Sequence, residues 1–424
     1  MFLNFLNKIK LVFKDKKLSK KIFFVLICLI IFRLFASIPI PGIDQNALRQ
    51  FLDNNEFFGL LNIFSGGGLS GLSIVMLGVG PYITSSIIMQ LLTIMSPKLK
   101  ALYHENGEMG RKKFMQYSRL LTLPIAVIQA FGFLMLLQQQ GIVAQLGTMA
   151  LVTNIITITA GSMLLMWVGE LISEFGIGNG VSLIIFSGIV AGLPTALRQI
   201  LFSYDPAMIP TYVAFLFVGI AIILGVVVIT ESERPIPITY AKQIRGNRQY
   251  GGVSTYLPLR VNMAGVIPII FALSVLLLPQ MITNFLSASS NPTVQSVSEA
   301  INNFLTNQWF YGITYFVLVF LFTYFYTAVT FDPNSISQNL QKSGAFIPGV
   351  RPGESTSAHI ANILTRITLV GASFLGVIAV LPIIVQNLSG ITSLTIGGTA
   401  LLIAVSVVID LIKKIESQIS MREY

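Results

Sequence analysis

Few residues in this chain have the type and spacing that chemistry requires. The ionisable side chains in or at the ends of its long apolar stretches include Arg33, Glu170 and Glu174. Ion-coupled transporters use such groups to bind the coupling ion or proton. We interpret Arg33 as close enough to the end of its stretch to reach the membrane surface or a partner. We interpret the two glutamates as bracing a loop, with proton relay as the alternative.

Catalytic and metal-binding patterns are equally weak. His104 and His359, the two histidines of the chain, are far apart in sequence and lack metal-ligand spacing. The run Gly176-Ile-Gly-Asn-Gly180 does not fit GxGxxG and follows an apolar stretch rather than a strand, so we interpret it as a tight turn. We therefore expect no catalytic site, no metal site and no cofactor.

The composition is that of a membrane protein. Hydrophobic residues make up 54% of the 424 residues and charged residues only 10%, whereas a soluble domain carries about 25% charged residues. So little charge cannot cover a water-facing surface, and the bilayer must be part of the solvent. Cys28 is the single cysteine, so a disulfide framework is excluded. The first apolar stretch follows a basic segment and lacks a small-residue cleavage site, so we expect it to be retained as a span.

Ten stretches are apolar enough and long enough to cross a bilayer as helices, which takes about 20 residues. Gly192 and Pro194 interrupt the fifth of them. The predicted spans are Ile22–Ile38, Ile74–Met95, Leu120–Leu137, Leu151–Ile172, Val181–Leu201, Ile209–Thr230, Val261–Ile282, Trp309–Val329, Ile367–Val385 and Leu394–Ile412.

The basic residues predict the orientation of these spans. Of the 27 Lys and Arg residues, 24 fall before the first span or in the loops on that same side. Only Arg49 and Arg198 fall on the other side, and Arg33 lies within the first span. Positive charge collects on the cytoplasmic side of membrane proteins, so we expect both termini in the cytoplasm. The net charge of +10 then reflects orientation rather than nucleic-acid binding.

The predicted fold is an all-α polytopic membrane protein, with ten transmembrane helices in two inverted five-helix halves around a central pore. The halves are residues 1–205 and residues 206–424, and the second carries large cytoplasmic loops at 231–260 and 331–366. An odd number of spans per half makes the halves enter the membrane in opposite orientations, which places a pathway at their interface. We detect no sequence similarity between the halves, so this symmetry rests on topology.

A glycine-rich external segment follows the first span. It reads Asn62-Ile-Phe-Ser-Gly-Gly-Gly-Leu-Ser-Gly-Leu-Ser73 and is too short to span a membrane. Such backbone is tolerated at membrane depth only inside protein or a water-filled cavity. Its composition fits a re-entrant plug and a loose external loop equally well.

The chain resembles the SecY family, the central subunit of the bacterial Sec translocon, along most of its length. Segments that carry the resemblance are Ile38–Asp44, Asn62–Ser73, Gly80–Gln90, Gly169–Gly180, Leu257–Pro268 and Lys342–Glu354, in the family's order. The lysine-rich N-terminus and the segments Gln138–Gly147 and Ser287–Asn307 look unlike the family.

The resemblance implies a clamshell of two halves around an hourglass pore whose waist is closed by aliphatic side chains. Such a lining blocks ions and water by dewetting and conforms around a passing polypeptide. The family favours isoleucine there, and Val79 and Val181 are one methylene shorter. Ordinary packing is the alternative for these positions. The implied ring is Val79, Ile83, Val181, Ile185, Ile270 and Ile403.

The resemblance also implies a plug on the external side and a lateral gate towards lipid. Gate polar residues can exchange interhelical hydrogen bonds that contribute about 0.6–2 kcal/mol, with static packing bonds as the alternative. The implied gate residues are Gln90, Gln129 and Asn262. The implied plug residues are Asn62, Phe64, Ser65, Gly66, Gly67, Leu69 and Ser73.

The two cytoplasmic loops would bind partners. Arg245 and Arg248 lie in a basic tip that suits ribosomal RNA phosphates, and Arg351 matches a family arginine that couples the channel to its motor. These charges also serve orientation, and both roles can hold together.

The resemblance implies a channel in the inner (plasma) membrane that passes unfolded, signal-bearing proteins and releases apolar segments into lipid. Implied partners are SecE-like and SecG-like membrane subunits, a SecA-like ATPase, the ribosome, signal sequences, nascent polypeptides and the lipid bilayer. A plastid homologue in a thylakoid membrane fits equally. A secondary solute transporter with inverted repeats is the rival class, which the lack of intramembrane ionisable residues and the plug segment argue against.

Overall fold

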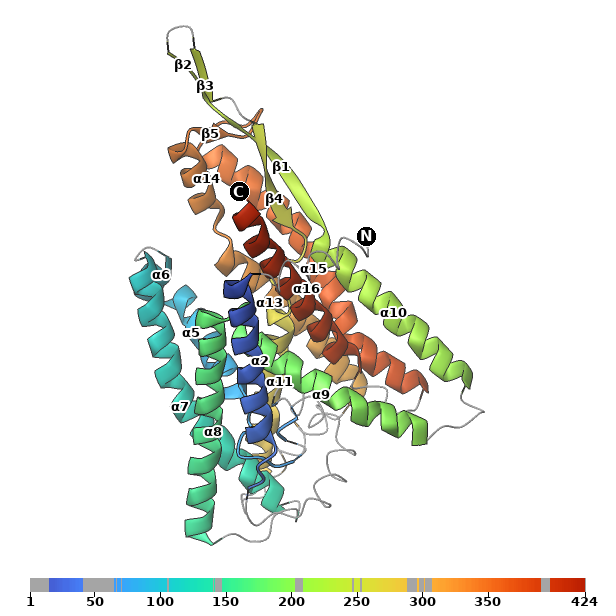
Figure 1. Ribbon diagram of the computed structural model, residues 1–424. Coiled ribbons are helices and arrows are strands. Elements are labelled where there is room, and N and C mark those ends of the chain that lie inside the picture. Colours follow the sequence, from blue (N-terminus) through green and yellow to red (C-terminus); the bar gives the residue numbers. More distant parts are fainter. Residues whose placement is uncertain are drawn as a thin grey trace.

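The computed structural model is predominantly helical (Figure 1). It describes residues 15–40, 65, 67–69, 71–104, 107–139, 141, 147–202, 209–245, 248–251, 254–287, 296, 301, 307–389 and 397–423. Ten long helices stand in this part of the chain: α2 (Lys16–Ala36), α5 (Gly80–Met95), α7 (Gly107–Gln139), α8 (Thr148–Phe175), α9 (Gly180–Phe202), α10 (Ile209–Glu231), α11 (Ile267–Ser287), α13 (Gln308–Thr330), α15 (Glu354–Ser389) and α16 (Gly397–Glu423). Two short helices, α6 (Pro97–His104) and α14 (Pro333–Lys342), lie between them.

Each of the ten predicted spans falls on one of the ten long helices. The fifth, α9, is continuous through Pro194. By length and composition alone, the described residues contain four helices suited to crossing a membrane: Gly107–Met135, Thr148–Phe175, Trp309–Lys342 and Glu354–Leu381. Three shorter apolar helices lie in α9, α10 and α11. The ten-span count is consistent with this arrangement.

The second and seventh spans begin with a turn rather than a helix. The apolar stretches start at residues 74 and 261, but α5 starts at residue 80 and α11 at residue 267. Gly78 and Gly265 have φ angles of 58° and 62°, in the left-handed region that favours glycine. Pro81 and Pro268 then occupy the first turn of each helix, where a missing N–H costs nothing.

These two turns reveal a repeat that the sequence analysis missed. Met76-Leu-Gly-Val-Gly-Pro-Tyr-Ile83 and Met263-Ala-Gly-Val-Ile-Pro-Ile-Ile270 share Met, Gly, Val, Pro and Ile at the same spacing. The backbone connections repeat as well. The Ile74 N–H donates to the Ile38 carbonyl just after α2, and the Val261 N–H donates to the Ser232 carbonyl just after α10, at 3.0 and 2.9 Å. In each half, therefore, a backbone hydrogen bond connects the turn before the second long helix to the end of the first long helix.

The described part of the chain contains five strands, which the sequence analysis did not predict and which extend from one end of the helices (Figure 1). Strand β1 (Glu233–Tyr240) lies between β4 (Ser254–Arg260) and β5 (Ala345–Phe346) in the order β4-β1-β5, and both pairings are antiparallel. Strands β2 (Lys242–Arg245) and β3 (Arg248–Gly251) form a separate ladder further out. We call this the β end of the molecule.

Side chains from this sheet form a small core with the helices beside it. Ile236 alternates with exposed residues along β1 and is 3% exposed. It shares an apolar cluster with Leu259 of β4, with Ile347 just after β5, and with Ile360 of α15. The strand pattern has period two, whereas the neighbouring helices have period 3.6. The two loops predicted at 231–260 and 331–366 thus form one folded unit.

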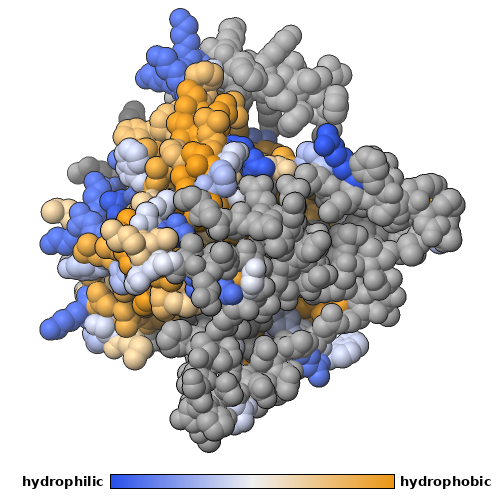
Figure 2. Space-filling view, turned by 90° about the horizontal axis from the view of Figure 1, so that it is seen from below, coloured by the Kyte–Doolittle hydropathy of each residue, from blue (hydrophilic) through white to orange (hydrophobic). Residues whose placement is uncertain are grey.

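The helices bury an apolar core and also present apolar side chains outwards. Residues from α2, α5, α8, α9, α10, α11, α13, α15 and α16 share one buried cluster. Large apolar side chains are exposed on outer faces, for example Phe23 and Leu34 on α2 and Phe217 and Leu224 on α10, all at least 60% exposed. Figure 2 shows such apolar side chains on the flanks from the end opposite the strands. A hydrocarbon environment accounts for these faces, which water would not.

Candidate functional site

Five of the six residues predicted to close a pore belong to the central apolar cluster, and Val181 packs against it. Val79 caps α5, Ile83 lies one turn further on, and Ile185, Ile270 and Ile403 come from α9, α11 and α16. These five side chains are between 0% and 8% exposed. The cluster therefore joins aliphatic side chains from both halves.

Val181 is the exception among the six. It is half-buried and packs against the edge of the cluster. One of its methyl groups lies 3.3 Å from the position that a Cβ on Gly169 would occupy. Val181 therefore packs against α8 at this glycine. Ile185 lies one turn later on α9 and is 1% exposed. It is therefore the residue of this pair that is buried inside the cluster.

A cavity of about 400 Å³ opens on the β-end side of the cluster. Val266 and Ile267 line it one turn before Ile270, and Ser406 and Val407 line it one turn after Ile403. Its other walls mix apolar side chains, such as Leu183, Met263 and Phe331, with the polar ones of Asn179, Ser182, Arg260, Asn262, Asp410, Lys413 and Lys414. This cavity, which we call the vestibule, thus brings polar and charged side chains next to the apolar cluster.

The described part of the glycine-rich segment is folded against the opposite side. Ser65, Leu69 and Ser73 are at most 2% exposed. The Ser65 hydroxyl accepts from the Leu69 N–H, and the Ser73 hydroxyl donates to the Gly68 carbonyl, both at 3.0 Å. Gly67 adopts a φ of 83°. Asn62, Phe64 and Gly66 lie outside the described residues.

A second apolar cluster surrounds this segment. It joins Leu69, Leu72 and Met76 to the ends of α7 and α8, including Leu134 and Ile158. Ile74 packs against this cluster and against the central one. The vestibule, the central cluster and the glycine-rich segment therefore follow one another through the molecule.

The three predicted gate residues have different surroundings. Gln90 on α5 donates to Ser86 of its own helix at 3.3 Å, while its Oε1 is buried without a hydrogen-bond partner among the described residues. Gln129 is half-buried on α7. Asn262 lies in the turn before α11 rather than in a helix, with its Oδ1 buried and likewise unpartnered among the described residues. Helix α11 contacts both α5 and α7, so these helices do form a seam between the halves.

The loop of Arg351 is held by side chains beneath it. Arg351 is exposed, and its carbonyl accepts from the Thr356 hydroxyl at 2.8 Å. The Gly353 carbonyl accepts from the Ser337 hydroxyl at 2.7 Å. Arg245 and Arg248 end β2 and begin β3 at the turn of that ladder, where their side chains are not described.

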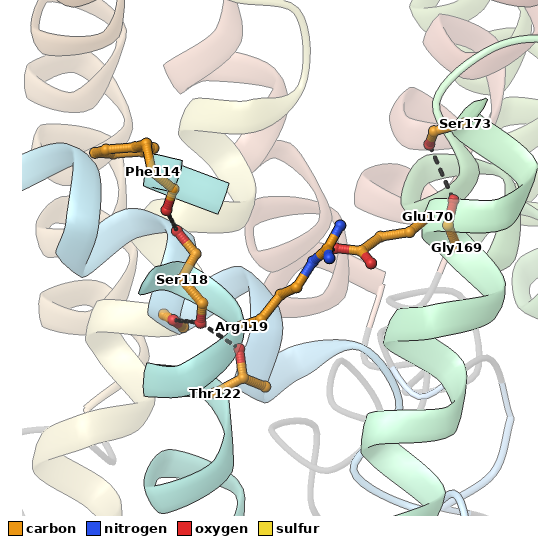
Figure 3. A network of polar contacts seen from close by, with 8 residues as sticks. Phe114, Ser118, Arg119, Thr122, Gly169, Glu170 and Ser173 are labelled. Atoms are coloured by element: carbon orange, nitrogen blue, oxygen red, sulfur yellow. Dashed lines mark hydrogen bonds and ion pairs between the residues drawn. The ribbon is translucent and has the colours of Figure 1, made fainter. Parts of the chain in front are cut away.

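Glu170 has a bracing role. It pairs with Arg119 of α7 across the gap between the two helices, as Figure 3 shows. On α5, the Ser85 hydroxyl donates to the Ser118 carbonyl of α7, and Ser173 of α8 accepts from the Gly180 N–H that begins α9. These polar contacts link α5 to α7, α7 to α8, and α8 to α9. Within the described residues, no group of three or more His, Cys, Asp or Glu side chains could hold a metal ion.

A sequence model of the SecY family matches residues 73–412, which include the six predicted ring residues, most of the vestibule and both loops. The chain belongs to the SecY family. Its similarity to individual SecY proteins extends over nearly the whole length. The protein translocase subunit SecY of Thermotoga maritima is 42% identical over 425 residues, which cover 97% of this chain and 95% of that one. The SecY of Corynebacterium glutamicum is 41% identical over 432 residues, 97% of each chain.

Solved structures give the same fold. A structure of a protein-conducting channel covers 94% of this chain and 92% of its own, with a TM-score of 0.63 at 20% identity. Sec61 of the canine ribosome-channel complex has a TM-score of 0.58 at 19% identity, with the same coverage. As a SecY-family member, the chain is a multi-pass membrane protein and a protein-conducting channel subunit, not an enzyme. The solute-transporter alternative is thereby set aside.

Proposed function

We propose that the central cluster is the seal of the channel, with Val79, Ile83, Ile185, Ile270 and Ile403 at the constriction and Val181 at its edge. The order of vestibule, aliphatic cluster and glycine-rich segment carries this proposal. An unfolded polypeptide would enter by the vestibule, part the aliphatic side chains and displace the segment beyond them. Aliphatic side chains suit this role because they exclude water without binding the substrate.

The glycine-rich segment acts as the plug, and the seam of α11 with α5 and α7 acts as the lateral gate. Within the part of the chain that the structure describes, the Oε1 of Gln90 and the Oδ1 of Asn262 are buried without hydrogen-bond donors, an unsatisfied state that a gate able to rearrange would explain. A signal sequence entering the seam would supply new packing where α11 now contacts α5 and α7.

The orientation and partners follow from the charges. The β end faces the cytoplasm with both termini, and Arg245, Arg248 and Arg351 contact a ribosome or a SecA-like ATPase there. Two structurally similar channels were solved in ribosome complexes: canine Sec61 and yeast Ssh1, the latter with a TM-score of 0.63. SecE-like and SecG-like subunits complete the translocon, and the chain lies in the plasma membrane. The division into halves falls between residues 205 and 206.

Reconstitution tests this function. The chain, assembled with SecE-like and SecG-like subunits in vesicles and supplied with a SecA-like ATPase and ATP, should move a signal-bearing precursor into a protease-protected compartment. The same precursor without its signal sequence should stay accessible. Equal protection of both precursors, or of neither, would contradict the proposal.

A further inference from the structure

We propose that Gly161 and Gly371 are positioning residues for the pore seal: each lets a helix touch the backbone turn from which a seal-bearing helix starts. Gly161 lies on α8 and Gly371 on α15, the fourth long helix of each half. The inference deepens the proposed function and rests on it.

In the first half, Gly161 faces the carbonyl of Ile74. A Cβ built on Gly161 would overlap the Ile74 oxygen and would lie 2.8 Å from its carbonyl carbon. Real Cβ atoms essentially never come within 3.0 Å of another heavy atom, and the atoms met here are backbone. Any side chain at 161 must therefore move the turn or the helix.

In the second half, Gly371 faces the carbonyl of Val261 in the same way. A Cβ on Gly371 would lie 2.6 Å from the Val261 oxygen. Ile74 and Val261 are equivalent members of the repeated turn, each followed four residues later by a left-handed glycine. The close approach thus recurs at matching places in both halves.

These turns fix where the seal residues stand. Val79 is the N-cap of α5, and Ile270 follows α11's start by three residues. The first residue of each turn is Ile74 or Val261. Its N–H donates a hydrogen bond to a carbonyl just after the preceding long helix, and its own carbonyl contacts a glycine. Because the N–H and the C=O of that residue are both in contact, a shift of the turn passes directly to Val79 and Ile83, or to Ile270.

The two halves differ in one respect. On α8, the residue after the glycine is Ser162, whose buried hydroxyl donates to the Gly78 carbonyl at 3.0 Å. On α15, the corresponding residue is Ala372, which is fully buried and has no donor. Among the described residues, a side chain of α8 therefore holds the turn of the first half at Gly78, whereas the matching residue of α15 supplies no such donor.

Alanine substitutions test the inference. We expect G161A and G371A each to raise the frequency of ion-conducting openings of the resting channel about tenfold in planar bilayers, equivalent to about 1.4 kcal/mol against the closed state. The matched control is G219A on α10, where a Cβ would meet nothing within 4 Å. G219A should conduct like the parent.

A third variant covers the case in which G161A does not accumulate. S162A adds no atoms, so it should fold normally and still raise the opening frequency, because the Gly78 carbonyl loses its donor. Parent-like conductance of G371A and S162A would overturn the inference. If serine substitutions in the seal itself leak while all three of these variants stay tight, the seal stands and only the positioning role is wrong. If the seal variants also stay tight, the proposed function fails first.

Discussion

Arg119 on α7 and Glu170 on α8 form an ion pair in which Nε and Oε1 lie 2.6 Å apart (Figure 3). The arginine side chain is 44% exposed and the glutamate side chain 17%, so water screens the pair in part. The pair joins the third and fourth long helices at the end where basic loops gather. It therefore braces the half against which α11 lies.

Breaking this pair should weaken the first half modestly. We expect Glu170→Gln to cost about 0.5–1 kcal/mol, because exposed ion pairs contribute little and this one is only partly buried. Thermal unfolding of the purified protein measures it. Glu174→Gln, one turn away on an exposed site, is the matched control. Equal destabilisation by both changes would show that the pair has no special role.

The loop beneath Arg351 should be needed for motor-driven export. Thr356→Val removes the donor to the Arg351 carbonyl, and loss of such a bond costs about 1 kcal/mol. We expect ATPase-driven translocation to fall, with Arg351→Glu giving the stronger defect while the protein stays folded. Protease protection of a precursor in reconstituted vesicles measures both.

A matched control lies on the same helix. The hydroxyl of Thr365 bonds to Ala361 within α15 and is exposed, so Thr365→Val should translocate like the parent. Normal export by Thr356→Val and Arg351→Glu would remove this loop from the partner surface.

Reporter fusions should establish the orientation. A cytoplasm-active reporter placed after Tyr424 should function, and a periplasm-active reporter should not, since 24 of the 27 basic residues were assigned to the cytoplasmic side. Fusions within residues 338–354 should behave in the same way. A periplasmic signal from that loop would contradict the ten-span topology.

The sequence predicted the helices better than the turns between them. Each of the ten apolar stretches contains a long helix, because about 20 apolar residues in a bilayer have few other ways to satisfy their backbone. Residues 74–79 and 261–266 are equally apolar but irregular, so hydropathy merged them with α5 and α11. Gly78 and Gly265, each followed by a proline three residues later, were the available signal.

The sequence analysis did not predict the strands because two of them contain proline. Pro235, Pro237 and Pro258 lie within β1 and β4, and proline usually argues against a strand. The ring positions came from the resemblance rather than from any pattern, since aliphatic residues on apolar helices look alike. Contacts such as Gly161 with Ile74 join residues far apart in sequence, which a single sequence does not reveal.

Conductance of the resting channel in planar bilayers tests the central claim most directly. Serine at two or more of Ile83, Ile185, Ile270 and Ile403 should let water wet the constriction, so the channel should leak ions and admit precursors with defective signal sequences. Deletion of residues 62–73 should add to the leak, because plug and seal act in series. Serine at Val408, a half-buried position on α16 that we expect off the pore axis, should leave the channel tight. Ring variants as tight as the parent, or a control that leaks equally, would show that these residues are ordinary packing and that the channel does not close here.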